Sequence, residues 1–309
     1  MGYKLAGYTV LGNCEIDPDM EKLYKQNQHP KYTYLMDIRN FNQLQVYPDE
    51  LKNLDILDGS PPCSVFSMTG RREKIWGKEK AFREGQKEQR LDDLFLHFIR
   101  TAEILRPKIV IAENVCGLLY GNAKGYVNEL LKAFEAAGYA VQIFQLNAQT
   151  MGVPQQRKRV FFIAHRHDLD YPKLKLNFKE PLIKFGEVRS KYGIPFKEGS
   201  LMAELSAKRR KGDNSFSDIS LRERNKYSMY SNRFNYDGCV AYTNVSGSVQ
   251  TRYCDGMRYS DHDYIATQTF PEDYDFMDQS TCYVCGMSVP PVMMAQISSA
   301  VYEQWLKEE

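Results

Sequence analysis

The chain has 309 residues, of which 43% are hydrophobic, 26% charged and 13% aromatic, and its formal net charge is only +2. This composition is typical of an ordinary soluble globular protein. No run of about 18 apolar residues is present, so we expect no membrane span. The N-terminus lacks the basic and apolar regions of a signal peptide, and seven scattered cysteines indicate free thiols in a reducing, cytoplasmic compartment.

The charge is unevenly distributed along the chain. Residues 61–90 carry eight lysines and arginines against four acidic residues, and residues 176–233 carry 13 against seven. Residues 234–309 carry three against 11. The two basic segments could line one cleft for a polyanion, although two solvated surfaces would give the same counts.

The first half of the chain alternates predicted strands with predicted helices. Strands are predicted for residues 8–14, 33–36, 54–57, 109–112, 141–146 and 159–164. Apolar residues recur at helical spacing over 91–105 and over 128–137, where Gly138 supplies the C-cap. This alternation predicts an α/β fold with a parallel sheet covered by helices on both faces.

The pattern changes after about residue 176. Residues 177–260 are rich in Ser, Asn, Arg, Lys, Tyr and Gly, with short strand-like pieces and no clear helical period. We therefore expect a smaller, irregular second domain. From Met287 onward the sequence returns to a loop that opens an apolar helix.

Pro61 and Pro62 directly precede Cys63, just after a predicted strand. Proline fixes φ near about −65° and donates no backbone hydrogen bond, so two prolines make a stiff loop that aims the next side chain. Cys63 is therefore a candidate nucleophile, and a buried cysteine after a turn is the alternative.

Charged side chains stand at the ends of several predicted strands. Glu113 follows the strand 109–112, Glu15 and Asp37 follow the first two strands, and Arg157 and Arg159 stand where the last strand begins. Ligands of such sheets bind beyond the carboxyl ends of the strands, and an acid after the second strand commonly holds ribose hydroxyls. We expect these side chains to converge on one crevice.

The order of these motifs resembles that of the DNA cytosine-5 methyltransferases. The resemblance rests on Pro61-Pro62-Cys63, Glu113-Asn114-Val115, Gln155-x-Arg157-x-Arg159, and the stretches QTFPEDYDF (268–276) and GMSVPP (286–291). It implies a Rossmann-like S-adenosylmethionine-dependent methyltransferase sheet. Residues 1–176 and 265–309 would form the catalytic and cofactor-binding domain, and residues 177–264 the target-recognition domain.

The resemblance also assigns chemical roles. Cys63 would add as a thiolate to C6 of cytosine, which makes C5 nucleophilic enough to take the methyl group. Glu113 would contact N3 and the exocyclic amine and donate a proton, while Arg159 would hold the O2 edge with Arg157 in support. Because these atoms are inaccessible in stacked DNA, the cytosine must be flipped out.

The cofactor and DNA contacts follow from the same resemblance. The cofactor, whose product is S-adenosylhomocysteine, would contact Glu15, Ile16, Asp37, Ile38, Pro61, Leu94, Met287 and Ser288. Duplex DNA would contact Ser64, Ser67, Arg71, Arg72 and Arg258. A monomeric, nucleoid-associated enzyme with a cognate restriction endonuclease is the expected setting.

The sequence departs from the family pattern in two places. Met287 stands where the family usually has asparagine. Residues 1–7 resemble the helix that follows the family's first strand and glycine-rich loop, so we expect that strand and loop to be missing and cofactor binding to be weak.

Three alternatives stay open on the sequence. The chain could be a tRNA methyltransferase of the same fold, or a non-catalytic DNA-binding protein or half of a split enzyme. Cys282 and Cys285 have metal-ligand spacing, but no second pair or nearby histidine accompanies them, which favours a structural role.

Overall fold

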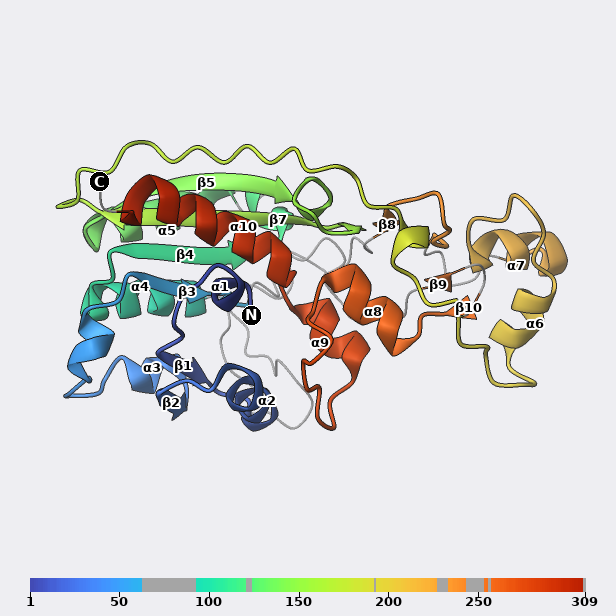
Figure 1. The fold of residues 1–309 in the computed structure, drawn as a ribbon, viewed down its shortest axis with the longest axis horizontal. Helices are drawn as coiled ribbons and strands as arrows, with labels where there is room; N and C mark the ends of the chain where they lie inside the picture. Colours follow the sequence, from blue (N-terminus) through green and yellow to red (C-terminus); the bar gives the residue numbers. More distant parts are fainter. Residues whose placement is uncertain are drawn as a thin grey trace.

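The computed structural model describes residues 1–62, 93–120, 124–191, 193–226, 233–242, 253–254 and 257–307. The molecule is elongated, with an α/β region at one end of the long axis and two short helices at the other (Figure 1). Five predicted site residues lie outside the described residues, as does most of the first basic segment: Cys63, Ser64, Ser67, Arg71 and Arg72.

All six predicted strands are present. They are β1 (Gly12–Glu15), β2 (Tyr32–Leu35), β3 (Ile56–Gly59), β4 (Ile109–Asn114), β5 (Tyr139–Asn147) and β7 (Lys158–Arg166). The first strand begins four residues later than predicted, because the Tyr8 hydroxyl donates to the Ser298 carbonyl and leads the preceding chain along the C-terminal helix.

The helices of this region are α1 (Gly2–Leu5), α2 (Pro18–Gln28), α3 (Ile38–Phe41), α4 (Leu94–Leu105) and α5 (Lys124–Ala136). Helix α2 begins where the Asp17 carboxylate accepts from the Asp19 amide and proline occupies the first helical position. Helix α5 ends before Gly138, whose φ of 86° is the left-handed conformation expected of a glycine at this position.

The expectation of an all-parallel sheet is wrong for one strand. The main sheet has the order β3-β4-β7-β5, in which β3 and β4 are parallel while β7 runs antiparallel to both β4 and β5. Between β5 and β7 the chain holds only a short 3₁₀ turn (Ala148–Thr150) and β6 (Gln155–Gln156). A parallel return needs a crossover of a dozen or more residues, so this connection forces an antiparallel strand.

The first two strands form a separate parallel pair, β1–β2, rather than joining the main sheet. In Figure 1 this pair lies beside α2, on the far side of β3 from β4.

Hydrophobic clusters cover both faces of the main sheet. Alternate residues of β7 face opposite clusters: Val160 and Phe162 pack with α4 and α5, whereas Phe161 and Ile163 pack with α10 (Pro291–Val301). Helix α10 crosses in front of the sheet in Figure 1. The core therefore has helices on both faces, as the alternating pattern predicts.

The irregular second region contains two helices that the sequence analysis did not expect, α6 (Leu201–Ala207) and α7 (Phe216–Arg224). They share a small core, formed by Leu205, Phe216, Ile219 and Phe234. Each helix is too short to show a clear apolar period. The N-cap residues Ser200 and Ser215, whose hydroxyls accept from backbone amides, are the signal that could have revealed them.

Short strands and a further helix connect this region to the sheet. They are β8 (Ala241–Tyr242), β9 (Tyr253–Cys254), β10 (Met257–Arg258) and α8 (Asp261–Gln268). Strand β6 pairs with β8. A third cluster joins Leu23 of α2 with Phe185, Tyr259, Phe270 and Val284.

The chain ends with α9 (Thr281–Met287), α10 and a π-helical turn (Tyr302–Leu306). The stretch Thr281–Leu306 has a mean hydropathy of 1.3 and passes a membrane-span test by length and composition, and half of it is buried. Met293, Ile297 and Val301 pack in the core against the sheet. We therefore interpret this stretch as core helices.

Candidate active site

The predicted acid and one predicted arginine form an ion pair at the edge of the main sheet. Glu113 lies near the end of β4 and Arg159 near the start of β7, and because these strands are antiparallel neighbours the two ends meet. The Arg159 Nε lies 2.8 Å from the Glu113 Oε1, and both side chains are mostly buried, at 13% and 14% exposure. The pair thus holds a carboxylate and a planar donor group side by side.

The loop that leads to Cys63 is attached to this edge. The Asn114 side-chain amide donates to the Pro61 carbonyl at 3.1 Å, and its own Oδ1 accepts from the Val115 amide at 2.9 Å. Asn114 is buried, so these bonds are shielded from water. The residue after Glu113 therefore fixes the start of the Pro61-Pro62-Cys63 loop, a role that sequence reasoning did not assign.

The second predicted arginine has different partners. Arg157 is 2% exposed, and its guanidinium donates to the carbonyls of Gly286 and Ser288 at 2.8 and 2.7 Å. It holds the end of α9 and the residue that follows it to the entrance of β7.

Two buried glutamines extend this network. Gln155 donates to the Gln268 Oε1 at 2.9 Å, and Gln268 donates to the same Ser288 carbonyl at 2.7 Å. Both glutamines are fully buried. Three motifs of the sequence are thereby tied together, because Gln155, Gln268 and Ser288 each belong to a different one. Buried amides give no periodic signal, so these bonds were not predicted.

The predicted ribose acid Glu15 ends β1. Its Oε1 accepts from the amides of Ile16 and Asp17 at 2.8 and 2.9 Å. Burial raises the pKa of the Glu15 carboxyl, and these hydrogen bonds only partly oppose the effect. Ile16 beside it is exposed, so an apolar surface lies next to the carboxylate.

The second predicted acid, Asp37, follows β2 and caps α3. It accepts from the Arg39 amide at 2.7 Å and from the Arg39 guanidinium at 3.0 Å. Arg39 also pairs with Asp93, directly before α4. The ends of β2 and α4 are thus tied together, which places Ile38 and Leu94, both partly buried, near this junction.

The remaining predicted residues lie on different elements. Met287 is exposed at the end of α9, and the Ser288 hydroxyl donates to the Val284 carbonyl at 2.7 Å. Arg258 is exposed on β10, which is bridged to Ile194 through backbone hydrogen bonds. No described contact joins Arg258 to the Glu113–Arg159 pair.

The Cys116 thiol lies within electrostatic reach of Glu113 and Arg159. Cys116 belongs to a 3₁₀ turn (Cys116–Leu119) that follows β4. Burial raises the pKa of its thiol, although the charge of Arg159 opposes this. In the parts of the chain that the structure describes, no group of three or more His, Cys, Asp or Glu residues could hold a metal ion.

The fold is shared with known methyltransferases. A protein assigned as a DNA modification methyltransferase encoded within an Escherichia coli prophage superimposes with a TM-score of 0.66 and 17% identity, covering 98% of this chain and 94% of that one. A mutant form of Spodoptera frugiperda DNMT2 gives a TM-score of 0.62 and 18% identity, covering 97% and 95%. The chain thus has the α/β fold of S-adenosylmethionine-dependent methyltransferases.

The sequence comparison specifies the family. The chain belongs to the C-5 cytosine-specific DNA methylases, whose family profile matches residues 1–303. The Type II methyltransferase M.NgoPII of Neisseria gonorrhoeae is 37% identical over 172 residues, which are 55% of this chain and 45% of that relative. M.FnuDI of Fusobacterium nucleatum is 33% identical over 170 residues, or 55% and 44%. The alignments thus cover less than half the length of these relatives.

Proposed function

We propose that this chain transfers a methyl group from S-adenosylmethionine to C5 of a cytosine in duplex DNA. The observation that carries the proposal is the Glu113–Arg159 ion pair at the sheet edge where Asn114 anchors the loop leading to Cys63. Membership in the cytosine-5 family and the Type II methyltransferase relatives support the same reaction.

In this mechanism the Cys63 thiolate adds to C6 of the flipped cytosine, and its electron pair makes C5 a nucleophile. Glu113 protonates or hydrogen-bonds N3 as negative charge develops there, and the Arg159 guanidinium donates to the O2 edge. After C5 takes the methyl group, a base removes the C5 proton and elimination releases the thiolate.

The cofactor would supply the methyl group. The Glu15 carboxylate, held by two backbone amides beside the exposed Ile16, has the acceptor oxygens and the apolar neighbour that a ribose and an adenine require. Asp37, Ile38, Pro61, Leu94, Met287 and Ser288 would complete this pocket. Arg157 acts on the architecture of the pocket instead of touching the base.

The proposed substrate is duplex DNA in the cytoplasm, acted on by a monomer. Residues 177–264 would recognise the target, and Ser64, Ser67, Arg71, Arg72 and Arg258 would contact the DNA. A cognate restriction endonuclease would fit the Type II relatives.

The division of the strands into two sheets favours a second candidate function. A strand pair β1–β2 that does not join β3 would hold Glu15 less firmly relative to the Glu113–Arg159 pair. The chain would then bind DNA while binding the cofactor weakly. Calorimetric titration with S-adenosylmethionine separates the two functions, since tight binding with turnover supports the enzyme and weak binding without turnover supports the second function.

A covalent trap tests the proposed chemistry. Duplex DNA in which 5-fluorocytosine replaces the target base should form an adduct with wild-type protein that mass spectrometry maps to Cys63. Cys63→Ala should form no adduct and transfer no methyl group while still binding DNA. Cys116→Ala, the matched control near the same ion pair, should keep both activities. An adduct on Cys116 would contradict the assignment of the nucleophile.

A further inference from the structure

The segment of residues 201–226, here named the basic hairpin, carries positive charge that the proposed chemistry does not use. It contains α6, α7 and the loop between them, with seven lysines and arginines against four acidic residues. All seven cationic residues are exposed: Lys208, Arg209, Arg210, Lys211, Arg222, Arg224 and Lys226. Four of them directly follow α6, and three lie in or just after α7. This concentration of positive charge requires an explanation.

Three of the four acidic side chains of the basic hairpin are paired with cations of the same segment. Asp213 and Glu223, with side chains 9% and 20% exposed, both pair with Arg222. Glu204 pairs with Lys208 at 2.8 Å, and the Asp218 carboxylate accepts from a backbone amide in the loop. Asp213 and Glu223 are thus shielded beside Arg222, whereas Glu204 and Asp218 stay exposed. With seven cationic against four acidic residues, the surface of the segment keeps a net positive charge.

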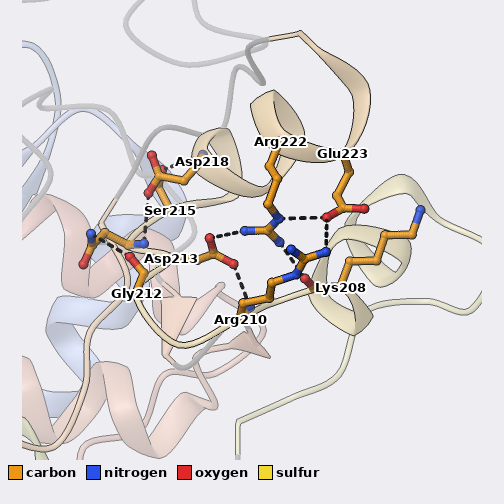
Figure 2. A network of polar contacts seen from close by, with 9 residues as sticks. Lys208, Arg210, Gly212, Asp213, Ser215, Asp218, Arg222 and Glu223 are labelled. Carbon is orange, nitrogen blue, oxygen red and sulfur yellow. Dashed lines mark hydrogen bonds and ion pairs between the residues drawn. The ribbon is translucent and has the colours of Figure 1, made fainter.

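Arg222 also fixes the shape of the loop. Its guanidinium contacts Asp213 and Glu223 and donates to the Lys208 carbonyl at 2.7 Å, so one side chain ties α7 to the residues after α6 (Figure 2). Burial raises the pKa of Asp213, but hydrogen bonds from Arg222 and the Arg210 amide outweigh this, so the net pKa is lowered. The Asp213–Arg222 ion pair is thus charged at neutral pH.

Three of the seven cationic residues of the basic hairpin have no carboxylate partner among the described residues. Lys211, Arg224 and Lys226 are exposed and form no ion pair with any residue that the structure describes. The Lys208 side chain points away from the Arg222 network (Figure 2). Exposed cations on a rigid support match a ligand with regularly spaced negative charges, because phosphates can replace the missing carboxylates.

We propose that the basic hairpin binds the phosphate backbone of duplex DNA away from the target base and adds affinity without reading sequence. The proposal rests on the proposed function. The hairpin lies at the end of the long axis opposite the main sheet (Figure 1), so its contacts fall outside the Glu113–Arg159 site. Its own aromatic core supports it as a separate platform. Phosphate contacts position a protein on DNA but carry no base information.

The test compares two triple variants with equal loss of charge. The hairpin variant combines Lys211→Ser, Arg224→Ser and Lys226→Ser. The control combines Lys132→Ser, Lys173→Ser and Lys179→Ser, three exposed lysines outside the basic hairpin. Fluorescence anisotropy measures binding to two duplexes of equal length and unrelated sequence over a series of salt concentrations. Each phosphate contact that is lost lowers the number of counterions released on binding. The slope of log K against log salt should therefore be smaller in magnitude by about 2–3 for the hairpin variant.

The outcomes separate this proposal from the catalytic one. A reduced slope on both duplexes, with a wild-type slope in the control, supports the hairpin as a backbone contact. A wild-type slope in the hairpin variant, an equal reduction in the control, or an effect on one duplex only would overturn it. Methyl transfer is measured separately. If no methyl transfer is found while the salt slope depends on the hairpin, the catalytic proposal is contradicted and the proposed backbone contact is still supported.

Discussion

At the scale of single residues, Arg157 and Arg159, which have one residue between them, bind different partners. Arg159 pairs with Glu113 in the candidate site, while Arg157 donates to backbone carbonyls of the α9–α10 loop. The first therefore lies beside the candidate acid, and the second holds the region between α9 and α10 to β7. A substitution of Arg159 should therefore lower methyl transfer, whereas a substitution of Arg157 should lower the stability of the fold.

Glu113→Gln should lower the rate constant of methyl transfer by at least about 100-fold, because the amide cannot donate the proton that the ring nitrogen requires. Single-turnover kinetics with labelled cofactor provide the measurement, and DNA affinity should stay unchanged. Glu103→Gln, an exposed carboxylate on α4, serves as the control and should transfer at the wild-type rate. A Glu113→Gln variant that retains most of its rate would remove Glu113 from the catalytic step.

Glu15→Gln should raise stability while weakening cofactor binding. Burial raises the pKa of Glu15 above its usual 4.5, so the folded protein holds the proton more firmly than the unfolded chain does. Ionisation therefore costs stability as pH rises from 4.5 through the raised pKa, and the cost persists above it. In thermal unfolding from about pH 4 to about pH 8, the stability of the variant relative to wild type should increase as pH rises.

Cofactor titration over the same pH range completes this test. Wild-type affinity should fall as pH drops through the raised pKa, since the protonated carboxyl loses acceptor strength, whereas the Gln variant should be weak and nearly independent of pH. Equal affinity of the two proteins for S-adenosylmethionine at neutral pH would exclude Glu15 as a cofactor ligand.

At the scale of elements, a few buried polar side chains decide how strands and helices meet. Gln155, Arg157 and Gln268 converge on the loop between α9 and α10, and two of them share the Ser288 carbonyl. Because a buried donor or carbonyl that is left unpaired lowers the stability of the fold, we expect this junction to tolerate few substitutions.

Arg157→Lys should destabilise the fold by about 2 kcal/mol, because the shorter lysine side chain does not carry its donors to the position of the Arg157 Nη2, which donates to both carbonyls. Urea unfolding measures the change. Arg100→Lys, on the exposed face of α4, is the control and should stay within about 0.5 kcal/mol of wild type. If the two variants are equally stable, the contacts of Arg157 with Gly286 and Ser288 contribute nothing measurable.

At the scale of the whole molecule, the irregular region and the sheet share a core. The third hydrophobic cluster contains Phe185 and Tyr259 from the predicted recognition domain together with Leu23 and Val284 from the catalytic part. The basic hairpin has its own core at the far end. The region between is thus held to the sheet while the tip is supported independently.

Exchange of residues 177–264 for the equivalent segment of another family member should change which DNA site is methylated and leave the transfer chemistry intact. The exchange has to retain Phe185 and Tyr259, since their loss would open a cavity against the catalytic part. Bisulfite sequencing of plasmid DNA reports the methylated sites. Site preference that stays unchanged in a folded, active chimaera would show that specificity lies elsewhere.

The sequence by itself determined the local elements and the chemistry at their ends. Apolar alternation and helical spacing predicted the six strands and α4 and α5, because such patterns need only neighbours along the chain. The order of Cys63, Glu113 and Arg159 identified the family. What only the tertiary structure decided depends on contacts between distant residues: the reversed direction of β7, the separation of β1–β2 from the main sheet, and the partners of Arg157. The helices α6 and α7 belong with these, since a few apolar residues and Phe234 from a separate loop give them their core.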